Sequence, residues 1–201
     1  MTEVIHDNMV EMAENVSDAL TQAITANGAI KLRRRGHLPL GEVLCRTIAG
    51  QQLSVKAASS IWSRVVVRAA DRAIVDYVNR ARVQTLRNCG LSAAKVKAIK
   101  GIARADIDGH LDTKIMRKQT TLERTETFTG LWGVGQWTAD MLNMFYFQDP
   151  DIWPDGDVAA RKTLQRLTPR RRSTIMTAEH FAPYRTYLAM HMWQFADNTP
   201  E

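Results

Sequence analysis

Three observations predict an all-α fold for this chain of 201 residues. Apolar residues recur at three- and four-residue spacing through most segments, as expected for helices that bury one face. Serine and glycine residues stand where these segments begin and end, in the manner of helix caps. The chain contains no alternating strand pattern of useful length, no internal repeat and no low-complexity stretch. A single helical domain over residues 1–201 is therefore expected.

The expected helices follow in order along the chain. The first covers residues 10–26 and stops at Asn27-Gly28, and the second follows Pro39 and breaks at Gly50. Ser54 is expected to cap the next helix, which buries Trp62 and Val65, and Ser92 caps another. The later helices are predicted at residues 74–82, 83–89, 93–103, 115–118, 121–129, 136–147, 158–167 and 179–195, with a loop at 106–113.

The charge balance favours a polyanionic partner. The formal net charge is +6, and the residues before Lys31 include acids but no Lys or Arg, so the positive excess lies in the rest of the chain. Arginine clusters at residues 33–35 and 170–172 belong to no motif and are interpreted as solvated faces rather than as contacts with such a partner.

Composition excludes several other classes. Cys45 and Cys89 are too few for a four-cysteine zinc or iron–sulfur site, and the five histidines show no metal-ligand spacing. The chain has no apolar run of about 18 residues. Its first residues lack the Lys and Arg of a signal or transit peptide. An intracellular protein without a membrane span or a catalytic metal is expected.

The segment around Gly133, Val134 and Gly135 predicts a glycine hairpin that opens into a helix at Gln136. Such a turn directs backbone N–H groups and the positive end of a helix dipole toward one point, where a phosphate binds. Thr138 is assigned to the same phosphate-binding hairpin. Phosphate contact carries no sequence information, and a purely structural turn between packed helices is the alternative.

An acidic residue is predicted at the start of the helix over residues 158–167. Asp157 occupies the N-cap position, where the dipole and free N–H groups favour a carboxylate. An ionised carboxylate can stabilise positive charge that develops on a sugar, and it can orient water. Asp155 competes for this role but has the sequence context of a turn, and an ordinary N-cap is the alternative for Asp157.

Four segments, at residues 48–58, 90–95, 133–139 and 154–161, together resemble the helix-hairpin-helix DNA glycosylases. The resemblance covers residues 38–193 and is closest to the alkylated-base branch, the 3-methyladenine DNA glycosylase II type. It implies a two-lobed helical fold with the active cleft between lobes and the helix-hairpin-helix at about residues 121–147. It also implies excision of alkylated bases from duplex DNA in base excision repair, by a monomer without a cofactor. Relatives bind a monovalent cation, Na⁺ or K⁺, at the hairpin of residues 133–135.

In this resemblance Asp157 matches the catalytic carboxylate, and Trp137 stands where strand-cleaving relatives carry a lysine nucleophile. An indole cannot form a Schiff base, so a monofunctional enzyme that uses water is expected. Trp137 resembles an aromatic wall of the base pocket, where its face attracts a cationic alkylated base; a core tryptophan is the alternative. Trp193 matches a second pocket aromatic, and Met141 stands where some relatives have a tyrosine or is simply core.

Extrusion of a base leaves a gap that a side chain fills. Gln52 occupies the register of this intercalating residue, with Leu53 as the second candidate, although neighbouring glutamines can also cap helix ends. Lys95 and Lys97 are predicted to point outward, as is Lys100, and the first two are alternative phosphate contacts.

The rival function is a non-catalytic helix-hairpin-helix protein that recognises DNA damage or structure. The sequence does not decide which lesion is preferred among 3-methyladenine, 7-methylguanine, hypoxanthine and ethenoadenine. It also does not decide whether the protein works in a nucleoid or in a nucleus.

Overall fold

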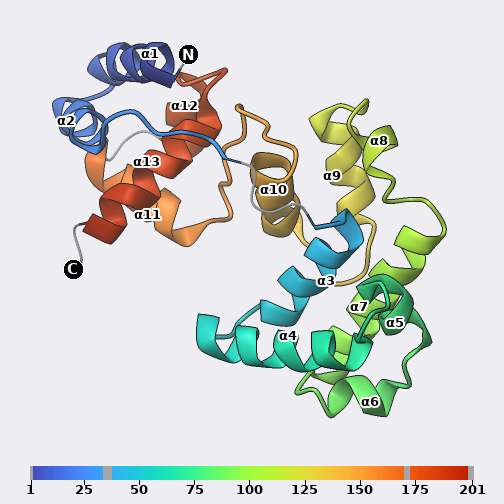
Figure 1. The fold of residues 1–201 in the computed structure, drawn as a ribbon. Helices are drawn as coiled ribbons and strands as arrows, with labels where there is room; N and C mark the ends of the chain where they lie inside the picture. The colour runs from blue at the N-terminus through green and yellow to red at the C-terminus, as the bar shows by residue number, and fades with distance from the viewer. Residues whose placement is uncertain (1, 34–37, 170–172, 199–201) are drawn as a thin grey trace. The chain divides into compact units, whose positions relative to one another are not determined.

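The computed structural model describes residues 2–33, 38–169 and 173–198, and every regular element among them is a helix (Figure 1). The predicted all-α class is confirmed. Contacts divide the chain into two units, one of residues 1–35 with 140–201 and one of residues 36–139.

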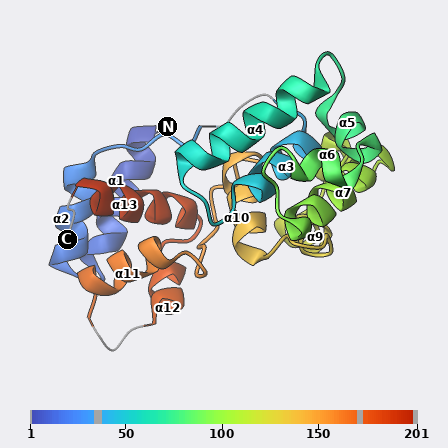
Figure 2. The ribbon, with the colours of Figure 1, turned by 90° about the horizontal axis from the view of Figure 1, so that it is seen from below.

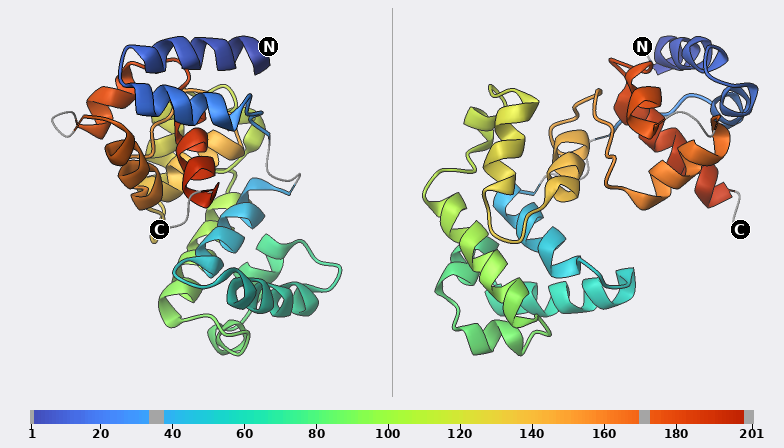
Figure 3. Two further views of the ribbon diagram at one scale, coloured as in Figure 1. Left: turned by 90° about the vertical axis from the view of Figure 1, so that its left-hand side faces the viewer. Right: turned by 180° about the vertical axis from the view of Figure 1, so that it is seen from behind.

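The unit of residues 36–139 is centred on two helices, α3 and α7, that pack side by side (Figure 3). Helix α7 also contacts α5 and α6, and the long helix α4 lies against α3 and α5 (Figure 2). Leu44, Ile48, Ile99 and Ile102 are almost fully buried. The helices are α3 (Leu40–Gly50), α4 (Val55–Ala69), α5 (Ile74–Arg80), α6 (Val83–Arg87), α7 (Ala93–Ile107), α8 (Thr113–Met116) and α9 (Thr121–Thr129), and α10 (Gln136–Phe145) begins in this unit.

Capping side chains start these helices where the sequence predicts them. Ser54 Oγ accepts a hydrogen bond from the Ala57 N–H at 3.3 Å, and Ser92 Oγ accepts one from the Lys95 N–H at 3.2 Å. Thr120 begins α9 with a capping box. Each cap satisfies an N–H that has no partner within its helix, which is why these boundaries can be predicted locally.

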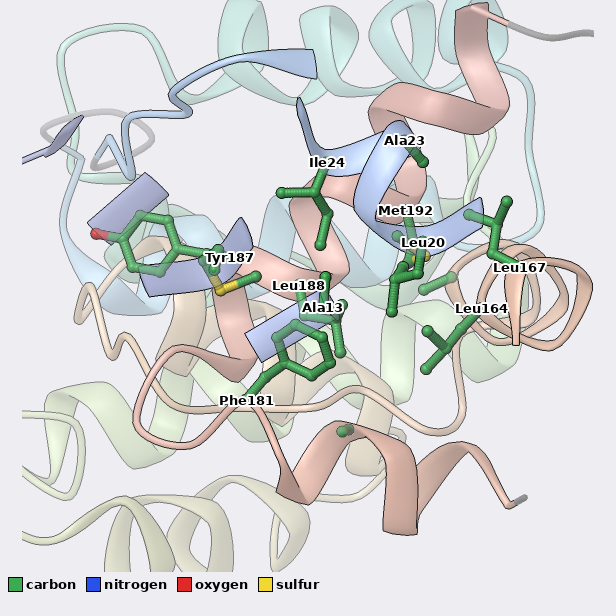
Figure 4. Packing of buried hydrophobic residues seen from close by; sticks show 13 residues of the cluster. Ala13, Leu20, Ala23, Ile24, Leu164, Leu167, Phe181, Tyr187, Leu188 and Met192 are labelled. Carbon is green, nitrogen blue, oxygen red and sulfur yellow. The ribbon is translucent and has the colours of Figure 1, made fainter. Parts of the chain in front are cut away.

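The second unit packs α13 (Arg185–Asn198) against α2 (Asp18–Asn27) and α11 (Val158–Leu167). Leu20, Ile24, Leu164, Leu188 and Met192 lie together in its core (Figure 4). Its other helices are α1 (Thr2–Glu14) and α12 (Thr174–Glu179), together with the part of α10 from Asp140 onward.

Two predicted helices are each interrupted. The helix predicted over residues 10–26 breaks between α1 and α2, where Ser17 caps α2 and its hydroxyl donates to the Leu167 carbonyl at 2.6 Å. Apolar residues of both helices face one core, so the periodicity continues across the break. The prediction of one helix over residues 179–195 is wrong for the segment between Glu179 and Arg185, which separates α12 from α13. Pro183 in this segment has no N–H for a helical hydrogen bond.

Three smaller differences concern local signals. Helix α7 continues to Ile107, so residues 106 and 107 are helical rather than loop. Helix α12 corresponds to no predicted helix and begins at a Ser173 cap. Lys100, predicted to point outward, donates to the carbonyls of Val78, Asn79 and Ala81 at 2.7–3.1 Å. Of the two arginine clusters, residues 34, 35 and 170–172 lie outside the described residues.

Candidate functional site

The predicted hairpin forms between α9 and α10. Gly133 has a φ of +87°, and a Cβ at this position would lie 3.0 Å from the Ala98 Cβ on α7. Both the backbone conformation and the close packing therefore require glycine at 133. Val134 is buried, and its N–H donates to the Leu131 carbonyl at 3.0 Å, which closes the turn.

Gly135 differs from Gly133. A Cβ at 135 would meet nothing within 4 Å, and the residue does not have a positive φ. The fold of this unit therefore does not require glycine here. A glycine in front of α10 leaves room for close approach to the first turn of a helix, the end that attracts anions. The turn's glycines offer only main-chain carbonyl oxygens to a cation, the type of ligand that hard cations accept; a bound Na⁺ or K⁺ stays a prediction.

The unit of residues 36–139 contains an open depression of about 630 Å³. It brings together the predicted pocket residue Trp137 and the two candidates for intercalation, Gln52 and Leu53. Trp137 is 41% exposed, which favours a surface role over the core alternative. The lining residues are Thr47, Gly50, Gln51, Gln52, Leu53, Gly135, Trp137 and Thr138.

Residues 51–53, hereafter the 51–53 loop, connect α3 to the cap of α4. Gln52 is exposed and has a φ of +57°, a left-handed conformation that is uncommon for a residue with a Cβ. Leu53 is 41% exposed, and its N–H donates to the Gly50 carbonyl at 3.2 Å. The loop presents both candidate intercalating side chains to solvent within this unit.

Lys95 and Thr138, both candidates for contact with DNA, hold this loop. The Lys95 ammonium donates to the carbonyls of Ala49 and Gln51 at 2.9 and 2.7 Å, and burial lowers its pKa. The outward orientation predicted for Lys95 is therefore wrong. Thr138 is buried, and its hydroxyl accepts a hydrogen bond from the Gln51 amide at 3.3 Å. Its side chain supports the loop.

Lys97 keeps the exposed position that the sequence predicts. Its Nζ lies 4.4 Å from the centroid of the Trp132 ring, within the range of a cation–π interaction. Trp132 precedes Gly133 in the hairpin and is 52% exposed. A positive charge is thus held beside the hairpin.

Asp157 lies in the other unit, at the N-cap of α11. Its Oδ1 accepts the Ala160 N–H at 2.9 Å and the Trp193 indole N–H at 2.9 Å. The helix cap was predicted, whereas the indole contact joins residues far apart in sequence and was not. Two donors on one carboxylate oxygen fix the orientation of the group.

Asp155 has a structural role in the same loop. Its Oδ1 accepts the Trp153 indole N–H at 3.2 Å and the Thr174 hydroxyl at 2.8 Å, which joins the loop to the first residue of α12. This geometry supports the interpretation of Asp155 as a turn residue.

Trp193 and Met141 are both half-buried at the edge of a small cluster that contains Met144 and Phe145. The Trp193 ring lies 6.1 Å from the Phe145 ring. This packing favours the core interpretation of Met141, and for Trp193 it adds the contact with Asp157 to its predicted pocket role. A contact of either residue with a base stays a prediction.

Within residues 2–33, 38–169 and 173–198, no group of three or more His, Cys, Asp or Glu side chains is arranged to hold a metal ion. In the same ranges no helix combines the length and apolar composition of a membrane span. Cys45 and Cys89 are both buried free thiols, and burial raises the pKa of Cys45.

A helical chain with a glycine hairpin before one helix and an acidic cap on a later one has the features of a helix-hairpin-helix DNA repair protein. The chain belongs to the HhH-GPD superfamily of base excision DNA repair proteins, whose profile matches residues 45–183. The resemblance seen in the sequence is confirmed.

Two curated proteins illustrate the relationship. The chain is similar to DNA-3-methyladenine glycosylase 1 of Schizosaccharomyces pombe, with 32% identity over 161 residues, 76% of this chain and 71% of that protein. It is 25% identical over 173 residues to DNA-3-methyladenine glycosylase 2 of Escherichia coli, which covers 81% of this chain and 60% of that protein.

Solved structures agree with this assignment. A DNA-3-methyladenine glycosidase from Bacillus halodurans matches with a TM-score of 0.81 and 27% identity over 96% of this chain and 89% of that one. The 3-methyladenine DNA glycosylase of Schizosaccharomyces pombe, solved in complex with abasic DNA, matches with a TM-score of 0.75 and 25% identity, over 94% of this chain and 97% of that one.

Proposed function

We propose that this protein is a monofunctional DNA glycosylase that removes alkylated purines from duplex DNA in base excision repair. The observation that carries the proposal is the Asp157 carboxylate, held by the Ala160 N–H and the Trp193 indole in a chain of this family. A protein that only binds DNA has no need of a carboxylate facing the sugar. The relatives named 3-methyladenine DNA glycosylases support the same substrate class.

Asp157 is proposed to act on the deoxyribose. As the bond between C1′ and the base nitrogen breaks, its electrons leave with the base and positive charge develops on the sugar. The carboxylate stabilises that charge and orients a water molecule. The water oxygen then bonds to C1′ as its proton passes to the Asp157 carboxylate, which leaves free base and an abasic strand.

Trp137 supports both the lesion class and the absence of strand cleavage. Its exposed indole has no amine to form a Schiff base with the sugar, so the abasic strand is left intact. Its ring face attracts a base that carries a positive charge, as many alkylated purines do. Trp193 and Met141 are proposed as further pocket residues.

The hairpin is proposed to hold the DNA backbone. The open space at Gly135 admits a phosphate to the first turn of α10, and Lys97 beside Trp132 supplies a second, charged contact. Neither contact reads a base. In this proposal residues 1–201 act as one catalytic domain and a monomer, in the compartment that contains genomic DNA.

The test is a release assay on DNA treated with a methylating agent, with the liberated bases identified by chromatography. Release of methylated purines by the wild type, and not by Asp157→Asn, is the expected result. Binding of damaged duplex without release of any base would instead identify a damage-binding protein. A covalent adduct trapped by borohydride would overturn the monofunctional assignment.

A further inference from the structure

The backbone of Gln52 is held in a conformation that its side chain does not favour. Its φ of +57° is positive, a region where glycine is the usual residue. Such conformations cost free energy and persist only where the surrounding structure imposes them. Gln52 is nevertheless exposed, so its own side chain is not packed in place. The constraint must come from its neighbours.

Lys95 supplies the first constraint. Its ammonium donates to the carbonyls of Ala49 and Gln51, at 2.9 and 2.7 Å, and so joins α7 to the end of α3 and to the start of the 51–53 loop. Lys95 lies in the first turn of α7, the end of a helix where a cation is unfavourable. The stability of α7 therefore does not explain a lysine here, whereas the two carbonyls do.

Thr138 supplies the second constraint. Its buried hydroxyl accepts a hydrogen bond from the Gln51 side-chain amide at 3.3 Å. Gln51 is thus held through its main chain by α7 and through its side chain by α10. The hydrogen bond from Leu53 N–H to the Gly50 carbonyl closes the loop on the other side of Gln52. The residue between these attachments has little freedom to turn inward.

We propose that Lys95, acting with Thr138 through Gln51, is a positioning residue that sets the direction in which Gln52 enters the gap left by an extruded base. The inference rests on the proposed function, because it assumes that Gln52 fills that gap. Lys95 itself does not touch DNA in this proposal. Its ammonium is occupied by two carbonyls, unlike that of the exposed Lys97.

The experiment compares the affinities of purified protein for two duplexes, one undamaged and one with a single tetrahydrofuran abasic site. The variants are Lys95→Met, Gln52→Ala and the double variant. Lys114→Met, which changes an exposed lysine of α8 in the same unit, is the matched control. Circular dichroism and thermal melting check folding.

The wild type should bind the abasic duplex more tightly, because only that duplex has a gap to fill. Gln52→Ala and Lys95→Met should each lower this preference by about tenfold, and the double variant should lower it no further than Gln52→Ala alone. Binding to undamaged duplex should stay the same in Lys95→Met, and Lys114→Met should match the wild type throughout.

Three results would overturn the inference. Additive losses in the double variant would show that Lys95 does not act through Gln52. Equal weakening of both duplexes by Lys95→Met would make Lys95 a phosphate contact. If Lys95→Met keeps the full wild-type preference for the abasic duplex, Lys95 has no role in positioning Gln52. If Lys95→Met fails to fold, Thr138→Val, which removes the acceptor and keeps the shape, is judged by the same criteria.

The measurement is independent of base release. If the wild type releases no base, but Lys95→Met lowers the preference for the abasic duplex, the proposed function is contradicted and the positioning role is supported. If the wild type releases base, but its preference for the abasic duplex depends on neither Gln52 nor Lys95, the proposed function is supported and the positioning role is contradicted.

Discussion

The two units hold their polar groups in different ways. In the unit of residues 36–139, lysine ammonium groups stabilise the ends of helices: Lys95 at the end of α3, and Lys100 at the end of α5. Burial lowers the pKa of both lysines. In the other unit, His191 is buried beside His6, with ring centroids 6.0 Å apart, and hydrogen bonds with Asn27 hold it.

This difference separates two tasks. Lysine side chains are long, so they can hold a surface loop from the neighbouring helix without covering it, as Lys95 does with the 51–53 loop. The unit that contains Asp157 instead fixes its carboxylate with an N–H and an indole. One unit therefore fixes an exposed loop, and the other fixes the orientation of a carboxylate.

The largest effect is expected from removing the charge of Asp157. Asp157→Asn keeps the size of the side chain, so folding and DNA binding should be retained while base release falls by about 10²- to 10⁴-fold. Single-turnover kinetics on methylated duplex measure this. Asp155→Asn is the matched control, and its effect should be confined to stability. An inactive Asp155→Asn with an active Asp157→Asn would reverse the assignment.

Acid should destabilise the unit that contains His191. Burial, and then the nearby His6, lower the pKa of His191 from 6.5 to about 4. Between these values the unfolded chain binds a proton that the folded chain does not, so stability present above pH 6.5 is lost as pH falls toward 4. The loss should be on the order of 3 kcal/mol.

Denaturant unfolding of wild type and His191→Gln at pH 7 and pH 4.5 tests this prediction. The variant should be less stable at pH 7 but should lose less free energy of unfolding between the two pH values. Equal losses in both proteins would show that His191 is not the source of the acid sensitivity.

A charge at Gly135 should affect DNA binding alone. Gly135→Asp places a carboxylate in open space in front of α10, so the protein should fold while its affinity for damaged and undamaged duplex falls by about tenfold. Filter binding on both duplexes measures this. Gly135→Ala, which adds only a methyl group, should have a smaller effect. If Gly135→Asp binds DNA with the affinity of the wild type, the hairpin is not part of the DNA-binding surface.

The smallest effect is expected at Lys97. Lys97→Ala should reduce the slope of log affinity against log salt concentration by about one, the loss of a single phosphate contact. Trp132→Ala should reproduce part of this loss, because the ring holds the ammonium at 4.4 Å. Trp132→Phe retains an aromatic face, so its salt slope should lie between those of Trp132→Ala and the wild type. An unchanged salt slope in Lys97→Ala would mean that this lysine does not contact DNA.

Local chemistry made much of this protein predictable from its sequence. The helices that begin at Ser54, Ser92 and Asp157 were placed correctly because a cap satisfies N–H groups only a few residues away. The glycine hairpin was likewise predictable, because glycine adopts the positive φ found at Gly133 without the steric penalty that other residues meet. The order of these local motifs was sufficient to indicate the family.

The tertiary structure decided what depends on contacts between distant residues. The hydrogen bond from Trp193 to Asp157, and the bonds that attach Gln51 to Lys95 and Thr138, join residues 36 to 87 positions apart. No local pattern specifies such pairs. A lysine in the first turn of a helix suggests exposure by its charge alone, and only packing shows that its ammonium reaches two carbonyls. The break before Ser17 depends on a contact of the same kind, because the Ser17 hydroxyl donates to the carbonyl of Leu167, which is 150 residues away in the sequence.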